Sequence, residues 1–577
     1  MKGTEPRQDR AQDAPRAAQG NNKDTNARQT LATGQAPQAA TEGQAQDALE
    51  AMSDATLSAP SGREQQIAAE KPFEHRPALD TGDLEVAVPV ERTENQRAGD
   101  AKITRMGTDS TLKLLLEFSV PAVVGVLVQT LYNVIDAMYV GAAVGADGLA
   151  ATTVANPAMT FMVAIAMLVG VGGNALAAIK LGERKKRVAE RVLGNSFVLL
   201  LVAGVIVWIV GLVALDPILR ASGADDVVLP HAHAFMIVIV AGCPLQFIAF
   251  GMNNFIRTAG HPNRALGSML IGTGANVVLG YLFVMVLDGG MTGAALATVC
   301  SWALSAAFVM QFFLARKSPM PLRRVSLGIK AKVALRICAL GVAPAVMELG
   351  FAVSNMIMNN LLMSFGAHDA LGSDGALAVM RVLSAVGLFT IMPSMGIAMG
   401  AQPIIGYNYG ARNFGRMKRT LGQAIVLGVA ITTPLWLSVL FLPDMYSHMF
   451  SLPAEYLDIT AWALVAYLVF IPIIPVSLIG SNYFDATGQA FKATVLTLTR
   501  QILFFIPLLL SAPYILPGLL GITPLQSLFL APSISDITSI LVVLTFLAFE
   551  WRRLRKLELG EQRAVAQQVG ELETGER

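Results

Sequence analysis

Long apolar stretches dominate the chain from residue 110 onward, and they are the feature that most constrains its fold. A helix needs about 20 mostly apolar residues to cross a bilayer. About twelve stretches of at least that length follow one another here. The sequence therefore predicts an all-α polytopic membrane protein. The predicted spans lie near residues 114–140, 150–180, 190–215, 232–257, 265–287, 292–315, 334–365, 375–402, 418–442, 458–483, 493–512 and 526–550.

Composition supports this class and excludes others. The chain is 54% hydrophobic and only 15% charged, whereas soluble proteins carry about a quarter charged residues. The net charge of +2 gives no basic field that would indicate a nucleic-acid partner. Cys243, Cys300 and Cys338 fall in apolar stretches without CxxC spacing, so we expect buried thiols and no metal site.

The first part of the chain differs from the rest. Residues 1–108 are rich in Ala, Gln, Glu, Asp and Arg and poor in aromatic residues, which predicts a disordered tail. The opening MKGTEPRQDR contains no apolar segment of the kind that a signal peptide requires. Such a tail is either a solvated segment without a function of its own or a regulatory or partner-binding segment.

The loops between the predicted spans alternate in charge. One set is rich in Lys and Arg, and the other set is nearly free of them. The basic set comprises residues 180–191, 257–264, 315–324, 409–419 and 551–556. Because basic loops stay in the cytoplasm, both termini are expected there.

Two halves of the sequence resemble each other. The segment from Gly182 to Gly194 aligns with that from Gly410 to Gly422, 228 residues later, and RTAGHPNRA aligns with DATGQAFKA at the same offset. Each repeat holds an even number of spans, so matched loops lie on one side and the repeats run parallel. Two six-helix lobes should therefore be related by a pseudo-two-fold axis along the membrane normal.

These patterns give the following predicted domains: a disordered cytoplasmic tail (1–108), a first lobe of six spans (109–315), a cytoplasmic linker (316–333), a second lobe of six spans (334–552) and a cytoplasmic C-terminal tail (553–577).

One polar stripe interrupts the first span. Gln129, Tyr132, Asn133 and Asp136 are spaced i, i+3, i+4 and i+7, so a helix places them on one face. That face should turn toward the interior of the bundle, because exposing a charged acid to lipid costs roughly a few kcal/mol of free energy. Two interpretations remain open: Asp136 binds a proton or a sodium ion, or it is a solvated acid near the outer interface.

Other polar residues in the spans could join such a site. In the first lobe they are Asn253 and Asn254 on span four, Asn276 on span five and Thr298 on span six. In the second lobe Glu348 and Arg381 either form a buried pair or reach an interface or a water-filled cavity separately. Met356 and Met392 belong to a methionine-rich part of spans seven and eight, which either repacks around varied ligands or is ordinary core.

Several motifs together resemble the MATE (multidrug and toxic compound extrusion) family, in its bacterial branch related to DinF and MepA. The resemblance covers almost all of residues 110–550. The motifs are SVPAVVGVLVQTLYNVIDAMYVG, GGNALAAIKLGERKKRVAERVLGNSF, FGMNNFIRTAGHPNRA, GAALATV and GAQPIIGYNYGARNFGRMKRTLG.

The resemblance implies alternating access between two lobes and export of cationic or amphiphilic small molecules, driven by entry of H⁺ or Na⁺, with no cofactor. It assigns the coupling ion to Tyr132, Asp136, Asn253 or Asn254, Asn276 and Thr298. Gln129, Asn133, Glu348, Arg381, Met356 and Met392 are candidates for the substrate cavity. Many relatives have a second acid four residues after the span-five Asn, and here that position is Gly280, which leaves the coupling ion open.

The resemblance also implies a bacterial inner-membrane protein, expected to be monomeric, in contact with lipid. A lipid-linked oligosaccharide flippase of the same superfamily is the alternative. A passive channel has no evident filter in this sequence. An enzyme is disfavoured, because the chain shows no nucleophile–base pair and no phosphate loop; His231 and His233, at the outer end of a span, fit a solvated helix start better than a metal site.

Overall fold

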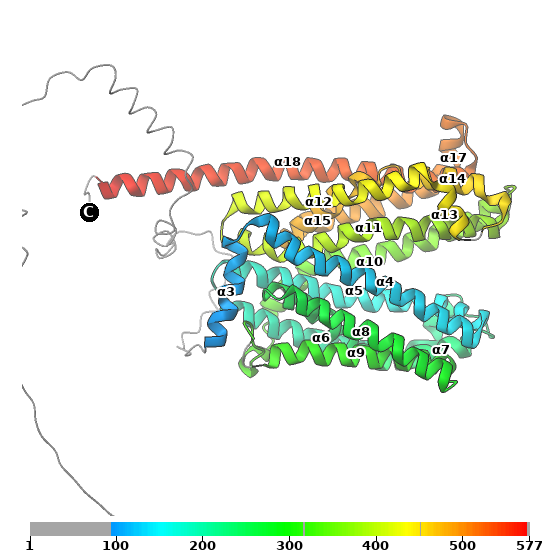
Figure 1. The fold of residues 1–577 in the computed structure, drawn as a ribbon, viewed down its shortest axis with the longest axis horizontal. Helices are drawn as coiled ribbons and strands as arrows, with labels where there is room; N and C mark the ends of the chain where they lie inside the picture. The colour runs from blue at the N-terminus through cyan, green and yellow to red at the C-terminus, as the bar shows by residue number, and fades with distance from the viewer. Residues whose placement is uncertain (1–93, 316–317, 451, 574–577) are drawn as a thin grey trace, which may run out of the picture. The chain divides into compact units, whose positions relative to one another are not determined.

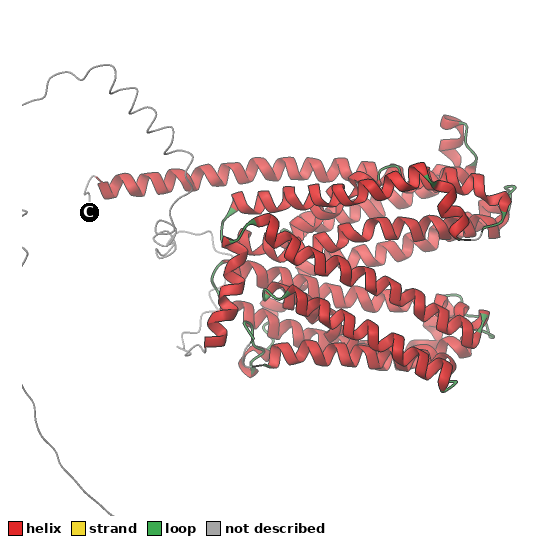
Figure 2. Ribbon diagram, in the orientation of Figure 1, coloured by secondary structure: helices red, strands yellow, loops and turns green. Residues whose placement is uncertain are grey.

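The structure is a computed structural model that describes residues 94–315, 318–450 and 452–573; the side chains of 94–99, 133 and 561–573 are outside this description. The prediction for residues 1–93 thus lies outside the described residues. The described part is helical and contains no strand (Figure 2). It holds 12 helices or helix pairs long and apolar enough to span a membrane, which confirms the predicted fold class.

Six spans form the N-lobe, which comprises α4 (Thr111–Val144), α5 (Ala146–Gly182), α6 (Lys186–Ala221), α7 (Leu229–Thr258), α8 (Pro262–Gly280) with its π-helical continuation η2 (Tyr281–Val286), and α9 (Gly290–Leu314). A short 3-10 helix, η3 (Arg324–Leu327), lies in the connection to the second lobe.

The C-lobe contains the other six spans and is less regular. Its elements are α10 (Ala331–Gly366), α11 (Gly372–Gly410), α12 (Phe414–Phe441), α13 (Pro443–Met449), η4 (Ala454–Tyr456), α14 (Leu457–Leu468), η5 (Ile471–Ile473), α15 (Ile474–Ala486), α16 (Ala490–Leu498), η6 (Thr499–Phe505), α17 (Ile506–Leu520) and α18 (Pro524–Glu573). Span ten is interrupted between α14 and α15, where Pro472 and Pro475 cannot donate backbone hydrogen bonds. Span eleven contains the π-helix η6.

The repeat appears in the backbone as well as in the sequence. Arg184 and Arg412, 228 residues apart, both have a positive φ, of 59° and 58°. Gly260 and Gly488, at the same offset, have φ values of 81° and 75°. Matched turns with matched left-handed residues confirm that the lobes are structural repeats.

One hydrogen bond connects equivalent positions of the two repeats. Asn174 of α5 donates from Nδ2 to Oε1 of Gln402 of α11 over 3.0 Å, and the two residues are 228 apart in sequence. A residue that touches its own equivalent must lie on the axis that relates the repeats. Both side chains are buried, so this pair marks the pseudo-two-fold axis inside the protein.

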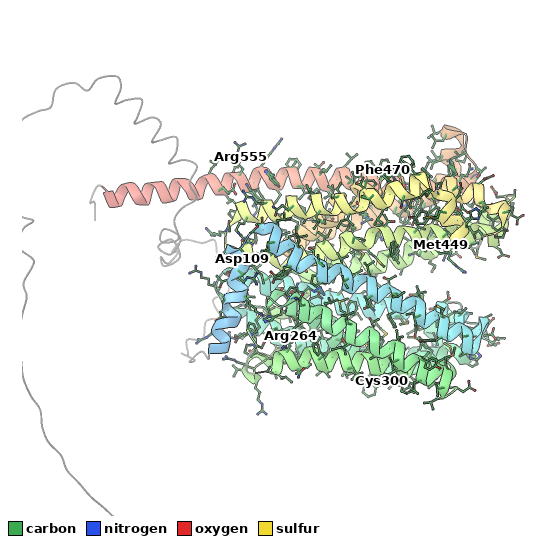
Figure 3. All side chains as sticks on the ribbon, in the orientation of Figure 1. Asp109, Arg264, Cys300, Met449, Phe470 and Arg555 are labelled. Carbon is green, nitrogen blue, oxygen red and sulfur yellow. The ribbon has the colours of Figure 1, made fainter. Side chains whose placement is uncertain are left out.

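The lobes meet at one end of the bundle, which we call the α3 end because α3 (Glu94–Thr108) lies there (Figure 1). Glycines make the closest approaches: a Cβ on Gly172 of α5 would lie 2.1 Å from the Ile337 carbonyl of α10, and one on Gly410 of α11 would lie 2.1 Å from the Ile179 carbonyl of α5. Only glycine lets helix backbones approach this closely. Figure 3 places Asp109 and Arg264 toward this end and Met449 toward the opposite end.

Residues 94–108 correct one prediction, since they form α3 and are not disordered. Ile103 and Met106, one turn apart, are 5% and 1% exposed and pack against the bundle. Two apolar side chains in a polar segment are too few to show an amphipathic helix in sequence. Arg105, hydrogen-bonded to Asp109, also holds the pKa of that carboxyl below its usual value. At the other terminus, the predicted tail begins within α18, which continues to Glu573.

Candidate ion-coupling site

Within the predicted stripe on α4, Tyr132 contacts another span of the N-lobe. Gln129, Tyr132 and Asp136 are half-buried, while the side chain of Asn133 is outside the described set. Asp136 lies about 12 Å from the end of α4 at Val144, by helical rise. The Tyr132 hydroxyl interacts with the Thr298 side chain of α9 and lies near the Asp136 carboxylate.

Asn276 of α8 completes this group. Its Nδ2 donates to the Thr298 hydroxyl over 3.1 Å, and both side chains are 1% exposed. The Asn276 Oδ1 is buried and accepts no hydrogen bond from any described residue. The structure therefore brings together Tyr132, Asp136, Asn276 and Thr298, which we call the N-lobe cluster. Its carboxylate, amide and hydroxyl oxygens suit either a proton or a hard cation.

Position 280 offers little room for a side chain in this structure. A Cβ on Gly280 would lie 2.9 Å from Cδ2 of Tyr139, one turn beyond Asp136 on α4. The Tyr139 ring thus occupies the space that a side chain at 280 would need. Asp136 is therefore the acid of the N-lobe cluster among the described residues.

Asn253 belongs to a different group. Its Nδ2 donates to the Ala265 carbonyl over 2.9 Å and to the Ser268 hydroxyl, and its Oδ1 accepts from Arg257 Nη2 over 2.6 Å. Asn253 lies about 8 Å from the α3 end of α7, whereas Asp136 lies about 37 Å from the α3 end of α4. This separation in depth removes Asn253 from the cluster around Asp136. Asn254 is half-buried.

Of the two alternatives for Glu348 and Arg381, the structure agrees with separate positions and not with a buried pair. Arg381 is exposed on α11 and Glu348 is half-buried on α10. Glu348 lies about 26 Å from the α3 end of its helix and Arg381 about 44 Å from that of its own, so the two differ in depth by roughly 18 Å. Of the two methionines, Met356 is 65% exposed, whereas Met392 is 4% exposed and its Sδ accepts a hydrogen bond from Thr130 of α4 over 3.2 Å.

The C-lobe contains an intramembrane ion pair that the sequence reasoning missed. Arg500 of η6 donates from Nη2 to Oδ1 of Asp536 of α18 over 3.2 Å, and the side chains are 22% and 19% exposed. Tyr467 of α14 lies near both charges and interacts with Ser384. Each charged residue interrupts an apolar run, Arg500 in TLTRQILFF and Asp536 in PSISDITSI. The sequence alone therefore indicates two charged residues inside predicted spans.

Breaking this pair should destabilise the protein. We expect Arg500→Leu to lower the free energy of unfolding by about 3 kcal/mol, because Asp536 would remain as an unpaired charge in a poorly solvated position. Adding Asp536→Leu should recover part of the loss, since two apolar residues leave no buried charge. Thermal unfolding of the purified variants measures both effects, with Arg555→Leu on the exposed part of α18 as the control. Equal melting temperatures for Arg500→Leu and wild type would contradict a stabilising role.

A further buried acid also escaped the sequence reasoning. Asp485 of α15 is 7% exposed and its Oδ1 accepts no hydrogen bond from the described residues. It occupies the position equivalent to Arg257 of the N-lobe, 228 residues earlier. The two lobes thus place a basic residue and an acidic residue at one repeat position.

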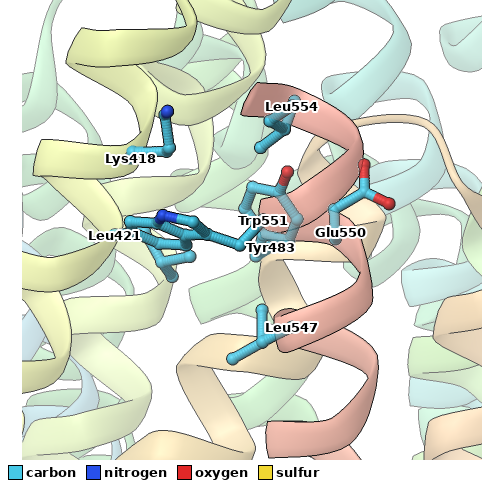
Figure 4. Close-up of a pocket in the computed structure, with 7 residues that line it drawn as sticks. All are labelled: Lys418, Leu421, Tyr483, Leu547, Glu550, Trp551 and Leu554. Carbon is cyan, nitrogen blue, oxygen red and sulfur yellow. The ribbon is translucent and has the colours of Figure 1, made fainter. Parts of the chain in front are cut away.

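A pocket between α12, α15 and α18 lies apart from the N-lobe cluster. Figure 4 shows its lining residues, which are Lys418, Leu421, Tyr483, Leu547, Glu550, Trp551 and Leu554. Lys418 pairs with Glu558 over 2.5 Å, and Glu550 pairs with Lys492 over 2.6 Å. No predicted site residue lines it, so we regard it as a packing gap at the edge of the C-lobe.

Together these features define a polytopic helical membrane protein built from two parallel repeats, with a polar cluster inside one of them. The family model described as MatE matches residues 121–282 and 344–510, one segment in each lobe. The chain belongs to this family of transporters, which confirms the resemblance seen in its motifs.

Curated relatives cover most of the spans. The multidrug export protein MepA of Staphylococcus saprophyticus is 22% identical over 445 residues, which is 77% of this chain and 96% of the relative. MepA of Staphylococcus aureus is 23% identical over 436 residues, or 75% of this chain and 93% of the relative.

Solved structures share the fold. An outward-facing multidrug resistance MATE family transporter of the MOP superfamily superimposes with a TM-score of 0.73 at 24% identity, covering 81% of this chain and all of that one. A MOP superfamily transporter from Pyrococcus furiosus, described as having a binding pocket of reversed polarity, gives a TM-score of 0.71 at 23% identity, covering 81% and 100%.

Proposed function

We propose that this protein is an ion-coupled antiporter that exports cationic or amphiphilic small molecules by alternating access. The observation that carries the proposal is the N-lobe cluster, in which one acid, Asp136, lies among Tyr132, Asn276 and Thr298 inside a span. The export activity in the names of the MepA relatives agrees with it.

The coupling ion is H⁺ or Na⁺. The cluster offers a carboxylate, the free Asn276 Oδ1 and hydroxyl oxygens, which can hold a proton or a small hard cation. Ion binding must favour one conformation and drug binding the other, because a ligand shifts an equilibrium only through its differential affinity for the two states. The proposal involves no catalytic step and no cofactor.

The substrate would bind between the lobes. We assign the cavity to Gln129, Asn133, Glu348, Arg381, Met356 and Met392. Met356 exposes most of its flexible thioether side chain on α10, which suits contacts with varied ligands. Met392 is buried and would act indirectly, through its contact with Thr130 of α4.

The proposed location is a bacterial inner membrane, with a monomer in contact with lipid and no nucleic-acid partner. The basic loops connect spans at the α3 end, including the turns at Arg184 and Arg412. Because basic loops remain cytoplasmic, the α3 end would face the cytoplasm and both termini would lie there.

Dye transport in proteoliposomes tests this function. Purified protein is reconstituted, and a fluorescent cationic dye is followed under an imposed pH gradient or an imposed sodium gradient. We expect dye to move against its own gradient under one of them, and that gradient identifies the ion. If neither gradient drives the dye, the drug-export proposal is wrong and a lipid-linked oligosaccharide becomes the next substrate to test.

A further inference from the structure

Helix α3 lies crosswise to the spans and contacts both lobes (Figure 1). Its buried residues Ile103 and Met106 pack into different apolar clusters. Ile103 joins the core of the N-lobe, whereas Met106 packs with Leu114 and Phe118 of α4 and with Ile404 of α11. This short helix therefore bridges the joint between the lobes.

The attachment of α3 to the N-lobe is electrostatic as well as apolar. Lys186 of α6 forms an ion pair with Asp100, and the two side chains are 20% and 26% exposed. Arg105 hydrogen-bonds to Glu117 of α4 over 2.9 Å. Since α3 also runs directly into α4, it must move with the N-lobe.

The attachment to the C-lobe uses the backbone of α3. Asn408 of α11, which is fully buried, donates from Nδ2 to the Met106 carbonyl over 2.9 Å. Arg416 of α12 donates to the carbonyls of Met106 over 3.3 Å and Thr108 over 3.4 Å, and also to that of Asp109. These carbonyls lie at the C-terminal end of α3, where a helix leaves its last acceptors free and a cation is favoured.

We propose that α3 is a clasp that holds the two lobes together at this end, and that the end opens only when Asn408 and Arg416 release α3. The inference rests on the alternating-access part of the proposed function. If the lobes separate here, α3 stays with α4 and the contacts that break are those with α11 and α12. The clasp therefore favours the conformation described here over one that is open at the α3 end.

A cysteine buried in the joint can report opening without any transport. Ser119 of α4 is 1% exposed and packs against Gly400 of α11. Ser119→Cys is nearly isosteric, and Cys243, Cys300 and Cys338 are replaced by Ala so that the new thiol is the one labelled. In lipid nanodiscs, the rate of maleimide labelling at position 119 then measures how often the joint opens.

Weakening the clasp should accelerate labelling. We expect Arg416→Gln to raise the labelling rate about 10-fold. Arg416 makes its charged hydrogen bonds to α3 only while the joint is closed, so the substitution destabilises the closed state and not the open one. Arg416→Lys keeps the charge but has fewer directed donors, so it should give an intermediate labelling rate. It replaces Arg416→Gln as the test variant if the Gln variant does not fold. Arg419→Gln removes an exposed charge from the same helix and should leave the rate unchanged.

The outcomes separate the clasp from the exporter. Labelling of both folded Arg416 variants at the rate of Arg419→Gln would overturn the clasp, whatever the dye experiment shows. Faster labelling of the Arg416 variants supports it, and does so even if neither gradient drives dye export in the wild type, in which case the proposed function fails and the clasp remains.

Discussion

Asp136→Asn is expected to reduce gradient-driven dye export at least ~10-fold while leaving the protein folded in the membrane. An amide has nearly the shape of the carboxylate, so packing around Tyr132 and Thr298 is retained. It carries no charge at any pH and holds neither a proton nor a sodium ion as the carboxylate does. Without an ion at the cluster, no difference in ion affinity between the two conformations remains, so the gradient cannot shift the equilibrium between them.

The measurement compares wild type, Asp136→Asn and Asp147→Asn in proteoliposomes under the effective gradient. Asp147 lies exposed in the first turn of α5, so the same chemical change there should not affect export. Uphill export by Asp136→Asn at the rate of the Asp147 control would refute the coupling role. Drug binding, measured by fluorescence, should persist in both variants.

The same variant also distinguishes the two ions. If sodium is the coupling ion, sodium should raise the melting temperature of wild type, because a ligand that binds the folded state stabilises it. The melting temperature of Asp136→Asn should then respond no more to sodium than to potassium. If the proton is the ion, neither protein should show a sodium-specific shift.

The fold was largely predictable because span length and loop charge are local properties. Twelve apolar runs gave twelve spans, and the 228-residue offset reappeared in the left-handed residues Arg184 and Arg412. The interruption of span ten could have been predicted from Pro472 and Pro475. Helix α3 could not, since its hydrogen bonds with Asn408 and Arg416 join residues that are distant in sequence.

The site was less predictable because it depends on depth along the helices. Tyr132 of the predicted stripe interacts with Thr298, and Asn276 donates a hydrogen bond to the same hydroxyl, so residues of spans one, five and six do meet. The residue type and the family resemblance both group Asn253 with them, although it lies near the α3 end beside Arg257. Counting residues from each helix end would have separated them. The pairing of Arg500 with Asp536 needed the relative rotation of η6 and α18, which no local pattern contains.

Gly341→Ala is expected to disrupt the joint between the lobes. A Cβ on Gly341 of α10 would lie 1.7 Å from the carbonyl oxygen of Leu168 in α5 and 2.4 Å from its carbonyl carbon. Both obstructing atoms are backbone, so no side-chain rotation relieves the contact. The helices must move apart by on the order of 1.5 Å to restore an ordinary C···O distance.

The cost should reach about 3 kcal/mol, the upper part of the range for overpacking a tight interface. If the folded protein exchanges between two arrangements, that cost falls on the one with the α3 end closed, and a difference of this size shifts a population roughly 100-fold. We therefore expect Gly341→Ala to abolish dye export. When Gly341→Ala is added to the Ser119→Cys protein, maleimide should label the cysteine much faster than it does in the Ser119→Cys parent. Gly172→Ala, which meets the Ile337 carbonyl from the facing helix, should behave alike.

The matched control is Gly422→Ala in α12, where an added Cβ meets no atom within 4 Å. That change should be neutral or slightly stabilising, because alanine loses less backbone entropy in a helix. Loss of export with a normal melting temperature in Gly341→Ala would mean that the closed joint is one working state of the transporter, since the protein persists without it but cannot complete its cycle. Normal export by Gly341→Ala would mean instead that the close contact of α5 with α10 plays no part in transport, and that the lobes need not close at this end to move a substrate.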